Sequence, residues 1–132
     1  MFELFKQLAL EYLDLWRQFL NMLYEVFPSN EIKATISNEL ELLDDVYDKL
    51  LDGFSWDEFA KMDKQLSKFI HYIYEHKEDL AKSKSKHKFS DARYTGEELY
   101  RLRMIMAALA RLVDDFFTCS PHKCSHIQIL TQ

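Results

Sequence analysis

Turn-forming residues are scarce in this sequence, because its 132 residues include only two glycines and two prolines. A sheet of several strands needs such residues in its tight turns, so the composition excludes a multi-stranded sheet. Apolar residues make up 48% of the chain, which is enough for one domain of this length to bury a substantial core. The composition therefore predicts a single all-α domain.

Cysteines are also few, and both lie near the C-terminus. Two such cysteines cannot cross-link a domain, so a disulfide scaffold is excluded and a reducing cytoplasm is the expected location. Glu3, Glu11 and Asp14 interrupt the first apolar stretch, which excludes a membrane span and a secretory signal there.

The common catalytic and metal-binding signatures are missing as well. The sequence has no P-loop, no glycine-rich dinucleotide motif, no nucleophile elbow and no H-E-x-x-H pair. A di-iron helical bundle would need E-x-x-H pairs on two helices, and none is present. These absences favour a binding protein over an enzyme.

The stretch from Phe2 to Phe27 is almost entirely apolar apart from one set of regularly spaced polar residues. These recur at steps of three or four and trace a narrow stripe on a helix, at Glu3, Gln7, Glu11, Asp14, Gln18, Asn21 and Glu25. A surface helix normally buries only one apolar face. This helix must therefore be covered on most sides, by its own chain or by a second one.

Four helices are predicted, over about residues 2–27, 30–51, 56–82 and 96–117. Pro28 ends the first helix, and Ser29 is placed to cap the second. The second helix has a single apolar stripe, formed by Ile32, Ile36, Leu40, Leu43, Val46, Tyr47 and Leu50.

Two capping boxes mark the expected starts of the last two helices. Ser55 and Glu58 have the S-x-x-E spacing, and Thr95 and Glu98 repeat it. The lysine-rich residues 83–94 between these helices are predicted to form a polar loop.

Short links between consecutive helices make neighbours antiparallel, so we predict an antiparallel four-helix bundle over residues 1–117, followed by an irregular tail over 118–132. Helices 2–27 and 96–117 carry more apolar surface than one neighbour each could cover. This excess indicates a homodimer through these helices, a groove for another protein, or a core that absorbs all of it.

Charge is distributed unevenly along the chain. Residues 1–60 contain 13 acidic and 4 basic residues, whereas residues 61–132 contain 9 acidic and 13 basic residues. The second helix concentrates its acidic residues at Glu39, Glu41, Asp44, Asp45 and Asp48. Such a face can cover a basic site on another protein or imitate phosphate.

The sequence therefore predicts a small helical protein-binding module without catalysis of its own. Its acidic helix 30–51 is the expected partner-binding surface, and exposed aromatic residues of helix 2–27 would supply further contacts. Inhibitors, immunity or antitoxin-type proteins and accessory subunits act in this way. No cofactor is expected for this role.

A first alternative is a small helical subunit of a nucleoprotein complex. Its basic residues would hold a phosphate backbone through the 77–93 loop and the following helix. The candidates are Lys82, Lys84, Lys86, Lys88, Arg93, Arg101 and Arg103.

A second alternative is magnesium-dependent nucleotide hydrolysis. Three pairs of acidic residues have the spacing of one helical face: Glu11 with Asp14, Glu41 with Asp44, and Glu75 with Glu78. All-α nucleotide pyrophosphohydrolases use such pairs. In those families an E-x-x-E pair precedes an E-x-x-D pair, whereas here the E-x-x-E pair comes last.

The C-terminal tail contains four potential zinc ligands within eight residues: Cys119, His122, Cys124 and His126. Thiolates with imidazoles suit tetrahedral zinc. Structural zinc sites generally take their ligands from two separate turns, so a tail with incidental cysteine and histidine is the other interpretation.

Overall fold

The computed structural model describes residues 2–52, 56–80 and 86–117, with side chains described over 3–52, 58–79 and 90–109. The described chain is almost entirely helical and contains no strand, which confirms the predicted all-α class. Its helices are α1 (Phe2–Val26), α2 (Asn30–Asp52), α3 (Trp56–Glu75), α4 (Lys77–Leu80) and α5 (Lys86–Phe117).

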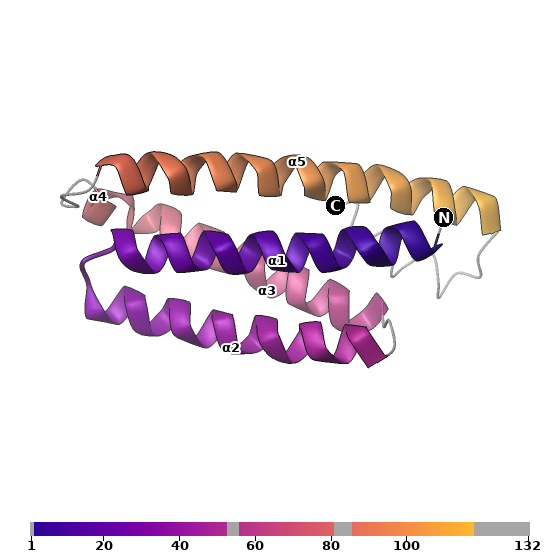
Figure 1. The fold of residues 1–132 in the computed structure, drawn as a ribbon, viewed down its shortest axis with the longest axis horizontal. Coiled ribbons are helices and arrows are strands. Elements are labelled where there is room, and N and C mark those ends of the chain that lie inside the picture. The colour runs from indigo at the N-terminus through magenta and orange to yellow at the C-terminus, as the bar shows by residue number, and fades with distance from the viewer. Residues whose placement is uncertain (1, 53–55, 81–85, 118–132) are drawn as a thin grey trace.

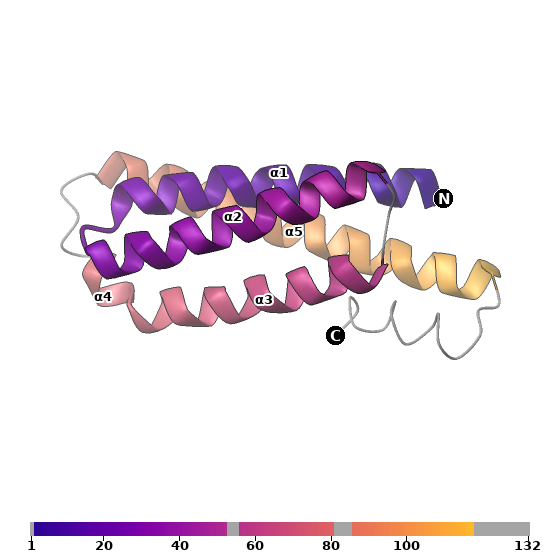
Figure 2. The same ribbon diagram turned by 90° about the horizontal axis from the view of Figure 1, so that it is seen from below.

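Helix α1 is central to the arrangement and packs along both α5 and α2 (Figure 1). Helix α3 packs beside α2, and the short α4 follows it (Figure 2). Aromatic side chains join α3 to α1, because the Phe59 ring lies 6.2 Å from the Phe5 ring and 6.0 Å from the Tyr12 ring, between centroids. The core therefore surrounds α1.

The polar stripe predicted for the first helix is present in α1. All seven polar residues of the stripe are exposed. Most apolar residues of α1 lie in the core or pack against it, whereas Leu4 and Tyr24 are exposed. The buried side chains here are Phe5, Ala9, Tyr12, Leu13, Trp16, Phe19, Leu20, Leu23 and Val26. One copy of the chain therefore covers most of α1, as expected for a helix with a single narrow polar seam.

The predicted link between the first two helices is confirmed. α1 ends at Val26, before Pro28, and α2 begins at Asn30. The backbone N–H of Ile32 donates to Ser29 Oγ over 3.4 Å, so Ser29 caps α2. The next helix, α3, begins at Trp56 as predicted. Ser55, the first residue of its predicted capping box, lies outside the described residues.

The prediction of a single helix over 56–82 is wrong, because the helix is interrupted at His76, between α3 and α4. The His76 backbone N–H donates to the Ile73 carbonyl over 3.0 Å instead of continuing the α-helical pattern to Tyr72. The Tyr72 carbonyl accepts instead from His76 Nδ1, 2.8 Å away. A side-chain donor has replaced a backbone donor, which ends the helix there.

The polar loop predicted up to residue 94 is also wrong, because α5 begins at Lys86. Lysine, arginine and alanine are good helix formers, and a buried stripe continues upstream of the predicted start through Ala92 and Thr95 to Leu99. Thr95 is therefore inside a helix and not its cap. Its Oγ1 donates to Met22 Sδ of α1 over 3.3 Å.

Candidate functional site

The outer surfaces of α1 and α2 are strongly acidic. Residues 2–52 contain 11 acidic and 4 basic residues. Glu41, Asp44, Asp45 and Asp48 are all exposed on α2. Among the described residues, Glu41, Asp45 and Asp48 have no hydrogen-bond or ion-pair partner, so their charges remain available to another molecule.

Arg17 joins the acidic surfaces of the two helices. Its Nη2 lies 2.7 Å from Asp44 Oδ1 of α2, and its Nη1 lies 3.6 Å from Asp14 Oδ1 of α1. Its guanidinium also lies 5.2 Å from the centre of the Tyr47 ring. One cation thus holds two carboxylates and an aromatic ring at the α1–α2 boundary.

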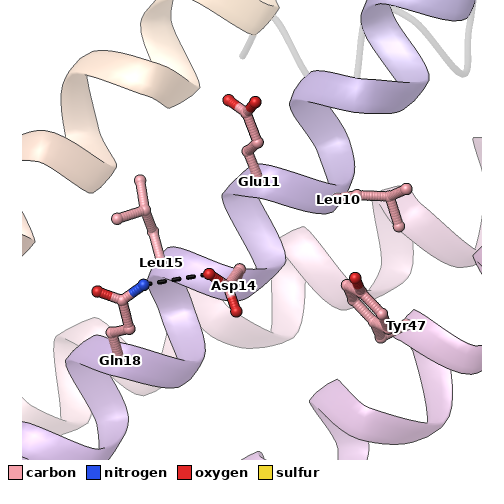
Figure 3. Close-up of a pocket in the computed structure, with 6 residues that line it drawn as sticks. All are labelled: Leu10, Glu11, Asp14, Leu15, Gln18 and Tyr47. Atoms are coloured by element: carbon pink, nitrogen blue, oxygen red, sulfur yellow. Dashed lines mark hydrogen bonds between the residues drawn. The ribbon is translucent and has the colours of Figure 1, made fainter.

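A shallow pocket of about 430 Å³ opens on this surface. Figure 3 shows its lining, with Leu10 and Tyr47 on one side of the α1 backbone and Leu15 on the other. Gln18 Nε2 donates to Asp14 Oδ2 over 3.1 Å, and Glu11 completes the polar part. Sequence reasoning did not assign these apolar members to a site, because Leu10 and Leu15 belong to a helix expected to be covered on most sides and Tyr47 belongs to the apolar stripe of the second helix.

Glu39 does not belong to the exposed acidic face. Its side chain is only 7% exposed, and Gln65 Nε2 of α3 donates to its Oε1 over 3.1 Å. Its Oε2 is buried without a hydrogen-bond partner. Burial raises the pKa of this carboxyl, and the bond from Gln65 opposes the rise. Its helical spacing from the buried Ile36 and Leu43 was the signal that could have placed it inside.

A polar cluster around the buried Asp63 joins α1, α3 and α5, and no pattern in the sequence indicates it. Asp63 of α3 is 3% exposed and accepts a hydrogen bond from Tyr12 Oη over 2.7 Å. It also accepts from Arg103 of α5, through Nη2 over 2.9 Å and Nε over 3.3 Å. Burial and the Asp63 charge raise the pKa of Tyr12, and the bond to Asp63 raises the pKa of Arg103.

Beside this cluster lies a pocket of about 400 Å³ between α1, α3 and α5. Its lining combines aromatic and aliphatic surface with several polar groups: Tyr12, Trp16, Ser67, Ile70, His71, Gly96, Leu99, Tyr100 and Arg103. Trp16 is 3% exposed, and its indole Nε1 has no hydrogen-bond partner. A Cβ at Gly96 would lie 3.2 Å from Phe19 Cε1, so glycine permits the close approach of α5 to α1 here.

Two of the predicted basic residues, Arg93 and Arg101, line one open pocket beside Phe19 of α1, and Arg103 does not line it. Arg103 is drawn into the buried cluster, and Arg93 Nε lies 3.7 Å from Glu97 Oε1 one turn later on α5. Arg101 is exposed. The side chains of the predicted lysines, Lys82, Lys84, Lys86 and Lys88, lie outside those described.

The three carboxylate pairs of the hydrolase alternative occupy different places. Glu11 and Asp14 are exposed on α1, and Glu41 and Asp44 are exposed on α2. Glu75 ends α3 while Glu78 belongs to α4, so this pair is not on one continuous helix.

No group of three His, Cys, Asp or Glu side chains that could hold a metal ion occurs within the described residues. The predicted zinc ligands Cys119, His122, Cys124 and His126 lie outside them. The described helices also include none long and apolar enough to cross a bilayer. The zinc site in the tail stays a prediction.

Comparison with known proteins adds no further assignment. The chain matches no protein-family model, no curated protein and no solved structure.

Proposed function

We propose that this chain is a non-catalytic helical module that docks on a basic partner protein through the exposed acidic face of α1 and α2. The helices would form an antiparallel four-helix bundle that holds this face rigid. The observation that carries the proposal is the row of exposed, unpaired carboxylates at Glu41, Asp45 and Asp48. Such charges steer a basic partner toward the surface before contact.

The pocket beside these carboxylates supports the same surface. Charged rims mainly set association rates and specificity, whereas affinity comes from buried anchors in apolar sites. Leu10, Leu15 and Tyr47 provide apolar surface next to Glu11 and Asp14. A partner with basic residues around an apolar anchor would match it. Inhibition, immunity or antitoxin-type neutralisation, and accessory-subunit binding all use such contacts.

The proposal is tested by recovering partners from host extract with the tagged full chain, with and without nuclease. A stoichiometric basic protein should survive nuclease, be lost from an Asp45→Lys/Asp48→Lys variant, and be retained by a Lys64→Glu/Lys68→Glu variant altered on the exposed face of α3. Recovery abolished by nuclease would favour the nucleoprotein alternative instead. Equal recovery by both variants would remove the acidic face from the proposal.

A further inference from the structure

The outer face of α5 is exposed and partly apolar, and the docking proposal does not use it. Helix α5 lies at one edge of the arrangement and packs mainly on α1 (Figure 1). Its large apolar side chains have high exposed fractions, at 60% for Tyr94, 65% for Tyr100, 48% for Met104 and 57% for Ile105. Apolar side chains gathered on one exposed surface indicate contact with another molecule.

Six exposed residues of α5 follow the spacing of a coiled-coil seam. They recur at alternating steps of four and three residues, on the side of the helix opposite the buried Ala92, Leu99 and Met106. These residues, called the α5 seam below, are Ser90, Tyr94, Glu97, Arg101, Met104 and Ala108. At the rise of an α-helix the seam is about 27 Å long. One further helix can therefore lie along this face.

The order of residues makes the α5 seam complementary to itself in the antiparallel direction. If Glu97 lies beside Arg101 of a second copy, twofold symmetry places Arg101 beside Glu97 of that copy. The same register places Tyr94 beside Met104, and a thioether sulfur packs favourably on an aromatic ring. It also places the small Ser90 beside the small Ala108. Every position of the seam thus has a suitable neighbour.

Other arrangements of two α5 helices match less well. A parallel pair would place Glu97 beside Glu97 and Arg101 beside Arg101, so like charges would repel. Sliding the antiparallel pair by one heptad would place Arg101 beside Met104 and Glu97 beside Ala108. Within its own chain, Glu97 Oε1 lies 3.7 Å from Arg93 Nε, and such an exposed contact is weak. Charge therefore selects one antiparallel register.

We propose that two copies of this chain associate through the α5 seam, as antiparallel helices related by a twofold axis. A second copy is the partner because a twofold interface needs both members of each pair on one surface, and the α5 seam supplies them. The homodimer expected through helices 2–27 and 96–117 is thereby narrowed to α5, since the chain itself covers most of α1. Helix α2 lies on the other side of α1 (Figure 1), so this association is independent of the docking proposal.

Sedimentation of the purified full chain tests the association without any other protein. The wild-type chain should pass from monomer to dimer between about 1 and 200 µM, because a single helix face is a small interface. A salt concentration of about 0.15 M suits the test, since it screens the repulsion between two acidic chains more than it screens charges in contact.

Charge reversals test the register. Glu97→Arg would place arginine beside arginine, and Arg101→Glu would place glutamate beside glutamate, so each should weaken dimerisation by about tenfold or more. An equimolar mixture of the two variants should form a heterodimer at least as tight as the wild type, because both pairs then have opposite charges. The control is Lys64→Glu on the exposed face of α3, which changes the net charge as Arg101→Glu does and should leave dimerisation unchanged.

Three results would overturn the proposal. The first is a wild-type chain that stays monomeric throughout this range, which would leave the α5 seam to a different protein. The second is wild-type dimerisation in either single variant. The third is a mixture that forms no dimer although both variants keep the helical circular dichroism of the wild type.

Discussion

Arg103 follows Asp63 by 40 positions in the chain, yet its Nη2 lies 2.9 Å from Asp63 Oδ2, which joins a half-buried guanidinium to a buried carboxylate. Tyr12 adds a third member from α1, so one carboxylate connects three helices. Buried charge pairs contribute little net stability compared with apolar residues, but breaking one leaves an uncompensated charge. This cluster connects α3 and α5 to α1 through polar side chains.

Arg103→Met should lower the free energy of unfolding by about 3–5 kcal/mol, because Asp63 would remain buried without its cation. Adding Asp63→Leu should restore most of this loss, since neither charge is then present. Urea denaturation measures both effects. The exposed Arg101→Met variant is the control and should change stability by less than about 0.5 kcal/mol. No loss in Arg103→Met would show that Asp63 is not buried without another partner.

Glu39→Gln should stabilise the protein at neutral pH but have little effect in acid. Burial raises the pKa of Glu39 in the folded protein above its ordinary value of 4.5. Between these two pKa values the folded protein holds a proton on Glu39 that the unfolded chain has lost. Stability from this group is therefore lost with increasing pH over that range. Glutamine stays neutral and avoids the loss.

This pH dependence is measured by urea denaturation at intervals between about pH 4 and pH 7. The matched control is Glu41→Gln, two positions away on the exposed side of α2. If both glutamine variants had the same pH profile, Glu39 would not be buried as the structure places it.

Thr95→Val should change the free energy of unfolding by less than about 1 kcal/mol, because Thr95 lies inside α5 and its hydroxyl donates only weakly, to a thioether. Ser29→Ala should cost about 1 kcal/mol, since it removes the cap of α2. Helical content by circular dichroism provides a second readout. A clear loss of helix in Thr95→Val would instead indicate the cap that its sequence spacing suggests.

Once a partner is identified, Asp45→Lys/Asp48→Lys should slow its association by about tenfold or more at low salt. The remaining rate should also depend less on ionic strength, because fewer charges attract the partner. Stopped-flow measurements at several salt concentrations provide the test, with Lys64→Glu/Lys68→Glu as the control. Unchanged rates would mean that the partner approaches another surface.

The sequence alone determined the helical class and much of the burial pattern. Helix α1 illustrates why. Its seven regularly spaced polar residues are all exposed, because they lie on one face of the helix and that face must point to solvent when the apolar faces are packed. The cap at Ser29 could be predicted equally well, since its hydrogen bond joins residues only three positions apart. The acidic face was predicted in the same way, except for Glu39.

Only the tertiary structure decided the features that depend on residues far apart in the chain. Sequence patterns predict Arg103 only as a candidate phosphate contact and assign no role to Asp63, whereas the packing of α3 and α5 brings the two side chains together. Thr95 has the spacing of a cap, but packing of the preceding turns against α1 extends α5 upstream and buries it. Local patterns predict local hydrogen bonds, whereas long-range partners depend on how whole helices pack, which no local pattern encodes.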